Sequence, residues 1–96
     1  MGATTFYQSA HGKTPEEAFK EAVEEAQYDY GHAGYTGTIA EKNSFCMIDL
    51  PEGKTAWQYA EELLDMNDDR ITDKWGDAGC IEVEQGEYLF FGWASE

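Results

Sequence analysis

The sequence has 96 residues, of which 42% are hydrophobic and 15% aromatic, and its formal net charge at pH 7 is -14. This length allows one domain with one hydrophobic core, and the apolar content argues against disorder despite the charge. Six basic residues against twenty acidic ones argue against a surface that binds nucleic acid, because such surfaces depend on lysine and arginine contacts to phosphate. We therefore expect a single acidic domain over residues 1–96, with basic proteins as its charged partners.

The chain contains no long apolar run, and its first residues (MGATT) include neither a basic nor an apolar segment. The sequence therefore predicts no membrane span and no secretory signal, and the cytoplasm is the expected compartment. Cys46 and Cys80 lie among apolar residues without C-x-x-C spacing. This pattern predicts two buried, reduced thiols and neither a disulfide nor a zinc site.

The first third of the chain predicts a strand followed by a helix. Residues 4–9 (TTFYQS) alternate β-branched, aromatic and polar side chains, as is typical of a strand. Thr14-Pro15-Glu16-Glu17 combines an N-cap hydroxyl, a proline at the first helical position and a glutamate three residues after the cap. These signals predict a helix over residues 15–30, whose buried stripe consists of Phe19, Ala22, Val23, Ala26 and Tyr30.

Three glycines, Gly31, Gly34 and Gly37, end this helix and predict an irregular joint over Gly31–Lys42. Strand-like residues follow at 38–42 and 44–50, as one bent strand or as a hairpin that turns at Lys42-Asn43. In the second piece, alternation places one group of side chains on one face and another on the opposite face. The first group is Cys46, Ile48 and Leu50, and the second is Phe45 and Met47.

The second half predicts a helix and a hairpin. Thr55 caps a helix that ends near Met66 and buries Ala56, Ala60, Leu63 and Leu64. After a long acidic loop, strands at 80–84 and 88–93 are joined by a turn at residues 84–87 (EQGE). The order β-α-β(β)-α-β-β predicts an α+β fold, a two-layer sandwich in which two helices cover one face of a mostly antiparallel sheet of four or five strands.

In a two-layer sandwich the second face of the sheet is not covered by helices. The last predicted strand has aromatic residues on both faces, so Tyr88 and Phe90 are expected to be exposed on the uncovered one. A second copy of the chain could cover them, so a homodimer is one alternative. Alternatively the long loop covers them, with Trp75 folded over the sheet.

The acidic residues are concentrated in the second half of the chain. Residues up to Ile48 contribute -4 (three basic, seven acidic) and the remaining residues -10 (three basic, thirteen acidic). Solubility requires a net charge of only about 2–8, and crowded like charges repel one another. The excess predicts an array of carboxylates that imitates the phosphates of nucleic acid and binds a basic protein; the alternative is a solvated surface. The predicted partner-binding residues are Glu61, Glu62, Asp65, Asp68, Asp69 and Asp73, with Trp75 as apolar anchor.

The sequence contains no metal motif of high specificity. Asp65-x-Asn67-x-Asp69 begins like a calcium loop, but Arg70 stands where a glycine is needed and Gly76 where a bidentate glutamate is needed. We therefore predict no metal site and no cofactor.

Catalytic chemistry is also not indicated. A nucleophile pair of Cys46 and His32 would require an exposed thiol, whereas the neighbours of Cys46 are apolar, and we expect no enzyme. The alternative to a protein-binding function is a small-molecule or metal-binding module that uses the Gly31–Lys42 segment with His32 and Tyr35.

Two segments, GHAGYTGTIAEK at Gly31–Lys42 and DKWGDAG at Asp73–Gly79, resemble a family of small acidic phage and prophage proteins. In that setting small, acidic, non-enzymatic proteins often inhibit host defence, as anti-CRISPR proteins and restriction inhibitors do. The resemblance implies an inhibitor in the cytoplasm of a bacterial host. Its expected partner is a CRISPR effector subunit or another nuclease, without direct binding to nucleic acid or membrane.

Overall fold

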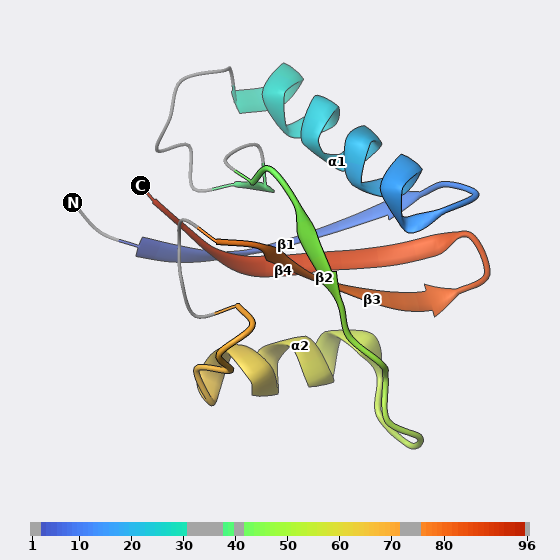
Figure 1. Ribbon diagram of the computed structural model, residues 1–96, viewed down its shortest axis with the longest axis vertical. Helices are drawn as coiled ribbons and strands as arrows, with labels where there is room; N and C mark the ends of the chain where they lie inside the picture. The colour runs from blue at the N-terminus through green and yellow to red at the C-terminus, as the bar shows by residue number, and fades with distance from the viewer. Residues whose placement is uncertain (1–2, 31–37, 40–41, 72–75, 96) are drawn as a thin grey trace.

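The computed structural model describes residues 3–30, 38–39, 42–71 and 76–95 (Figure 1). The elements are β1 (Ala3–His11), α1 (Pro15–Tyr30), β2 (Phe45–Met47), α2 (Ala56–Asp65), β3 (Ala78–Glu84) and β4 (Glu87–Ser95). The strands form one sheet in the order β1-β4-β3-β2. β4 is antiparallel to both β1 and β3, whereas β2 is parallel to β3. The predicted α+β class, with two helices and a mostly antiparallel sheet, is confirmed.

Side-chain caps fix the start of both helices. Before α1, the Glu17 N–H donates to Thr14 Oγ1 over 3.2 Å, and the Lys13 N–H donates to the Glu17 carboxylate over 2.9 Å. Before α2, the Gln58 N–H donates to Thr55 Oγ1 over 3.2 Å, and the Gln58 side chain accepts from the Thr55 N–H. Such caps satisfy backbone groups at the helix start, and each stabilises a helix by about 1 kcal/mol. Both helices therefore begin where the sequence predicted.

The face of the sheet under α1 is built around small residues of the helix. Ala18, Ala22 and Ala26 are fully buried, and Phe19 and Val23 are partly buried, so the predicted stripe is confirmed for its described side chains. Alanines allow close approach of the helix to the sheet. The aromatic rings fill the remaining space, with the Phe19 ring centroid 5.1 Å from that of Phe45 and 5.5 Å from that of Phe90.

α2 buries its predicted residues on the opposite face of the sheet. Ala56, Ala60, Leu63 and Leu64 pack in a second core with Ile81, Leu89 and Phe91. Figure 1 shows α1 on one side of the sheet and α2 on the other. The prediction that both helices cover one face is therefore wrong, and the domain has three layers.

The strand order explains why the helices lie on opposite faces. β1 and β2 are the two edges of the sheet, and the directions of the pairings make β1, β2 and β3 parallel to one another. The connection through α1 crosses the sheet from β1 to β2, and the connection through α2 returns from β2 to β3. Connections between parallel strands are almost always right-handed, so two crossings in opposite directions place their helices on opposite faces.

β4 is consequently buried on both faces. Tyr88 and Phe90 belong to the core beneath α1, and Leu89 and Phe91 belong to the core beneath α2. The predicted exposure of Tyr88 and Phe90 is therefore wrong, because a helix covers each face. The near-continuous apolar sequence of this strand reflects its central place in the sheet.

The region 38–50 contains less strand than predicted. Among its described residues only Phe45–Met47 is a strand, and Thr38 and Ile39 are not, while residues 40 and 41 lie outside the described residues. The predicted alternation of side chains between the two faces is nevertheless confirmed for three residues. Phe45 packs beneath α1, whereas Ile48 and Leu50 pack beneath α2. A three-residue strand suffices because it pairs with β3 on one side only.

The β3–β4 hairpin turns where it was predicted. Gly86 has a φ of +84°, the left-handed backbone angle that glycine adopts without strain. Gly79 in β3 faces the ring of Phe91, where an added Cβ would lie 2.6 Å from Cζ. The glycine therefore provides room for an aromatic ring across the strands.

Candidate protein-binding surface

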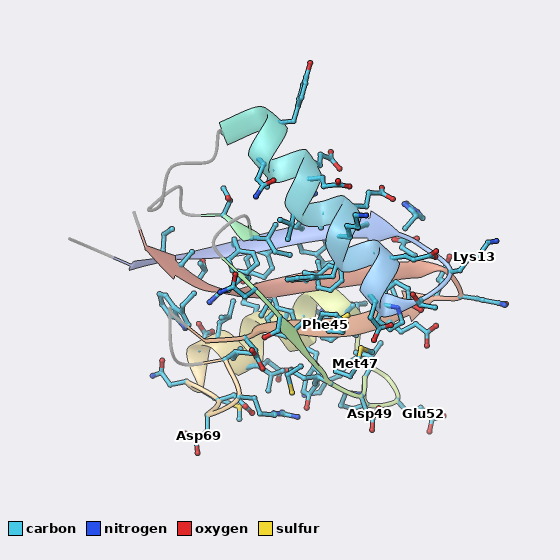
Figure 2. All side chains as sticks on the ribbon, turned by 45° about the horizontal axis from the view of Figure 1, so that its top comes forward. Lys13, Phe45, Met47, Asp49, Glu52 and Asp69 are labelled. Carbon is cyan, nitrogen blue, oxygen red and sulfur yellow. The ribbon has the colours of Figure 1, made fainter. Side chains whose placement is uncertain are left out.

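The predicted acidic residues are arranged along α2 and the turn that follows it. Glu61, Glu62 and Asp65 are exposed on the helix, and Asp69 is exposed in the turn, whereas Asp68 is half-buried. Figure 2 shows Asp69 projecting from this turn. We call these five residues the α2 acidic surface. The predicted contacts Asp73 and Trp75 lie outside the described residues.

Glu62 is already paired within the chain. Lys54 Nζ donates to both carboxylate oxygens of Glu62, over 2.9 and 2.8 Å. Both side chains are exposed, at 42% and 48%, so this ion pair contributes less than about 1 kcal/mol to stability. It nevertheless neutralises one of the predicted contact residues.

Asp68 is paired more firmly. Its two carboxylate oxygens accept from Nε and Nη2 of Arg70, each over 2.9 Å, and one also accepts from the Arg70 backbone N–H over 3.0 Å. These hydrogen bonds lower the pKa of Asp68 to about 2. The same turn places Ile71 in the core beneath α2, so Asp68 has a structural function in closing the turn.

Glu61, Asp65 and Asp69 remain, and none of them forms an ion pair with another described residue. Glu61 and Asp65 are one helical turn apart, so their side chains lie on the same side of α2. Trp57 precedes Glu61 by one further turn, and 51% of its surface is exposed. The spacing thus aligns one tryptophan and two free carboxylates along the helix.

A tyrosine from β1 completes this group. The ring centroids of Tyr7 and Trp57 are 5.4 Å apart, with planes tilted by 34°. Burial raises the pKa of Tyr7, and the negative charges of Glu61 and Asp65 raise it further. Both carboxylates are therefore electrostatically coupled to Tyr7. We call Tyr7, Trp57, Glu61 and Asp65 the aromatic–acidic stripe.

The sequence contained a signal for Trp57 that our prediction did not use. The buried residues of α2 are Ala56, Ala60, Leu63 and Leu64, whereas Trp57 has the spacing of Glu61 and Asp65. A tryptophan on the polar side of an amphipathic helix indicates a contact surface. Tyr7 could not be found in this way, since its position depends on which strand lies at the edge of the sheet.

The polar side of α2 also lines a broad, open depression. Its lining residues are Lys54, Gln58, Glu61, Glu62 and Asp65. Among the described residues, no group of three histidine, cysteine, aspartate or glutamate side chains is placed to hold a metal ion. The depression is thus a charged surface on which a side chain of a partner could lie.

Neither cysteine is placed as a nucleophile by the described residues. Cys80 is fully buried, and burial is the main cause that raises its pKa to about 12, which leaves the thiol protonated and unreactive. Cys46 is half-buried and not fully buried as predicted, because it lies on the short edge strand β2. Its predicted partner His32 lies outside the described residues.

The alternative site at Gly31–Lys42 is described only at residues 38, 39 and 42, and His32 and Tyr35 lie outside the described residues. Ile39 is part of the core beneath α1. Lys42 is 4% exposed, and its Nζ donates to the Gly76 carbonyl over 3.0 Å and lies 6.0 Å from the centroid of the Phe6 ring. Lys42 therefore ties this segment to the loop before β3, and the small-molecule alternative stays a prediction.

Comparisons of the chain with protein-family models, with curated proteins and with solved structures find no match. In the part of the chain that the structure describes, no helix is long and apolar enough to cross a membrane. The described residues form an acidic α+β domain with one helix on each face of a four-stranded sheet.

Proposed function

We propose that this protein is a non-enzymatic inhibitor that binds a basic, nucleic-acid-binding protein through the α2 acidic surface. The observation that carries this proposal is the aromatic–acidic stripe, in which two carboxylates without an ion pair among the described residues lie beside an exposed tryptophan. Carboxylates one helical turn apart have Cβ atoms about 5–6 Å from each other. They offer the lysine and arginine side chains of a nucleic-acid-binding cleft the charge that phosphates normally provide.

The aromatic residues of the stripe supply contact area, which charge alone does not provide. Tryptophan and tyrosine are enriched among the residues that dominate binding energy, because they bury a large area at low entropic cost. An arginine that pairs with Glu61 would also reach the ring of Trp57, where a cation–π contact contributes about 0.5–2 kcal/mol. Charge would thus give selectivity for basic partners, and the aromatic pair would give affinity.

The net charge of -14 supports the same mechanism at longer range. A strongly acidic protein is attracted to a basic cleft before contact, which raises the association rate and makes that rate sensitive to salt. This attraction would let the protein compete with nucleic acid for the cleft.

The resemblance to small acidic phage proteins supports a target in bacterial defence. A CRISPR effector subunit or another nuclease has a basic, nucleic-acid-binding cleft, whose lysines and arginines would pair with the carboxylates of the α2 acidic surface. The domain would act by occupying that cleft, with no chemical step of its own.

The test is capture from a bacterial lysate that contains CRISPR effectors, with the immobilised protein and two charge-matched variants. The first variant carries Glu61→Gln, Asp65→Asn and Asp69→Asn. The second carries Asp49→Asn, Glu52→Gln and Glu84→Gln, which remove the same charge from exposed residues elsewhere. Figure 2 shows Asp49 and Glu52 projecting from the loop between β2 and α2.

The wild type and the second variant should retain a basic protein that the first variant does not retain. Double-stranded DNA should release the retained protein, because both compete for one cleft. Equal loss with both variants would show that net charge, and not this surface, attracts the partner. Failure of DNA to release the partner would contradict competition.

A further inference from the structure

β1 has one open edge. In the described part of the chain this strand pairs only with β4, and it ends the sheet order β1-β4-β3-β2. Its nine residues pair with β4 without a register shift. Among the described residues, one side of a long, regular strand therefore has no pairing partner, and such an edge can pair with an added segment.

A hydrogen bond beyond the strand identifies which backbone groups face this edge. The Gly12 N–H donates to the Gly86 carbonyl over 3.1 Å, and these two residues continue the register of His11 with Glu87. In an antiparallel pair, such a bond marks residues whose N–H and C=O groups point to the partner strand, and every second residue does so. The N–H and C=O groups of Thr5, Tyr7 and Ser9 therefore point away from β4, toward the open edge.

The residues of β1 itself also lack the features by which an edge strand usually prevents pairing. Natural edge strands carry lysine, proline or a bulge, which disfavour the addition of another strand. β1 has the sequence ATTFYQSAH, with no proline and no charged residue before His11. This absence contrasts with the rest of a chain in which 27% of residues are charged.

Both flanks of this edge are acidic. On the α2 face, Tyr7 lies beside Trp57, Glu61 and Asp65. On the α1 face, a second depression brings His11 of β1 together with helix residues, and its lining includes Glu17, Lys20, Glu21 and Glu24. The side chains of an added strand alternate between the two faces, so both sets would lie near carboxylates.

The acidic charge beside β1 favours one kind of added strand over another. A second copy of the chain would bring the same acidic flanks together, with a net charge of -14 on each molecule. An extended segment rich in lysine or arginine would instead find opposite charge on both faces.

We propose that an extended basic segment of the partner adds to β1 as a further strand of the sheet. Its backbone would pair with the outward groups of Thr5, Tyr7 and Ser9. Its basic side chains on one face would reach Glu61 and Asp65 across the Tyr7–Trp57 pair. The basic character of the segment rests on the proposed function, whereas the open edge is independent of it.

The experiment uses two labelled peptides of nine residues, the length of β1. One alternates arginine with valine and can form a strand. The other has the same sequence with every backbone nitrogen methylated, which keeps the charge but removes all the N–H donors that an added strand needs. Binding is measured together with amide hydrogen exchange of β1, and both peptides are tested against the wild type, Ser9→Pro and Ser9→Ala.

Ser9→Pro removes one outward N–H, and proline is tolerated on edge strands where the N–H faces solvent. Ser9→Ala keeps that N–H and serves as the matched control. The thermal midpoints of both variants show whether the fold is retained.

The unmethylated peptide should bind the wild type and Ser9→Ala at least about tenfold more tightly than it binds Ser9→Pro. It should also bind the wild type more tightly than the methylated peptide does. At saturation the amides of Thr5, Tyr7 and Ser9 should exchange at least about tenfold more slowly.

Both peptides could bind the wild type equally and fail to bind the variant with Glu61→Gln and Asp65→Asn. This result would overturn strand addition and leave the acidic surface as the binding site. Absence of binding by either peptide would overturn strand addition, while the lysate experiment still decides the proposed function. A wild-type dimer that Ser9→Pro dissociates would also overturn it, since a second copy would then occupy β1.

Discussion

The ring of Tyr7, on the first strand, lies 5.4 Å from the ring of Trp57, at the start of the second helix. This contact joins α2 to the edge of the sheet and leaves half of Trp57 exposed. Because Glu61 and Asp65 follow Trp57 along the helix, the contact brings aromatic surface and negative charge together. The proposed binding function depends on this arrangement.

Trp57→Ala should weaken partner binding while the protein still folds. Loss of the contact with Tyr7 removes about 0.5–1.5 kcal/mol from the free energy of unfolding, in addition to the burial of the covered half of the side chain. Loss of a central aromatic anchor costs about 2 kcal/mol or more in binding, roughly thirtyfold in Kd. Urea denaturation and titration calorimetry measure the two effects. Met66→Ala, which truncates a side chain that is 68% exposed at the end of the same helix, should change neither.

The pKa of Tyr7 should report the nearby carboxylates directly. Burial is the main cause that raises it above its usual value of 10, and Glu61 and Asp65 are the further causes. The double variant Glu61→Gln and Asp65→Asn should therefore lower this pKa, while burial keeps it above 10. NMR titration of the Tyr7 ring measures the shift. An unchanged pKa would mean that the carboxylates are not close to the phenol.

Asp68→Asn should destabilise the fold in a pH-dependent manner. Hydrogen bonds from Arg70 lower the pKa of Asp68 in the folded protein to about 2, from its usual value of 3.8. The ion pair therefore stabilises the fold above about pH 4 and loses this effect as the pH falls through 2. The expected loss at neutral pH is on the order of 1 kcal/mol, reduced by solvent screening at a turn. Denaturant unfolding at several pH values measures it.

Asp69→Asn is the matched control for this prediction, since Asp69 is the next residue, is exposed and forms no ion pair among the described residues. Its unfolding free energy should follow that of the wild type at every pH. A pH-independent difference between wild type and Asp68→Asn would contradict the account of the turn.

Lys42→Met should destabilise the fold although it removes only one charge. The buried ammonium group donates to the Gly76 carbonyl, and loss of a charged hydrogen bond that leaves a partner unsatisfied costs about 1–3 kcal/mol. Lys54→Met removes the exposed ion pair with Glu62 and should cost less than about 1 kcal/mol. Thermal unfolding of both variants compares the two lysines. Equal stability of the two would mean that Lys42 has no special structural function.

The helices and the hairpin could be predicted from sequence because their signals are local. Thr14 and Thr55 cap the helices, the apolar residues recur at helical spacing, and Gly86 permits the tight turn. The faces that the helices cover depend on strand order, which is not local. The apolar run from Tyr88 to Phe91 did contain the relevant signal, since a strand buried on both faces does not alternate.

The candidate surface could be predicted only in part. Glu61 and Asp65 are exposed on α2 as expected, but Asp68 is held by Arg70, a pairing that the two-residue spacing would have suggested. Trp57 has the helical spacing of Glu61 and Asp65, but it was not among the predicted contact residues. Tyr7 joins the surface only because β1 lies at the edge of the sheet, next to β4.

The most direct test of the central claim is the affinity of the captured partner for two variants of equal net charge. One carries Glu61→Gln and Asp65→Asn, and the other carries Asp49→Asn and Glu52→Gln. The account predicts that the first binds at least about tenfold more weakly than the wild type, while the second binds within about twofold, because only the first pair lies beside Trp57 and Tyr7. Equal weakening by both variants would contradict it.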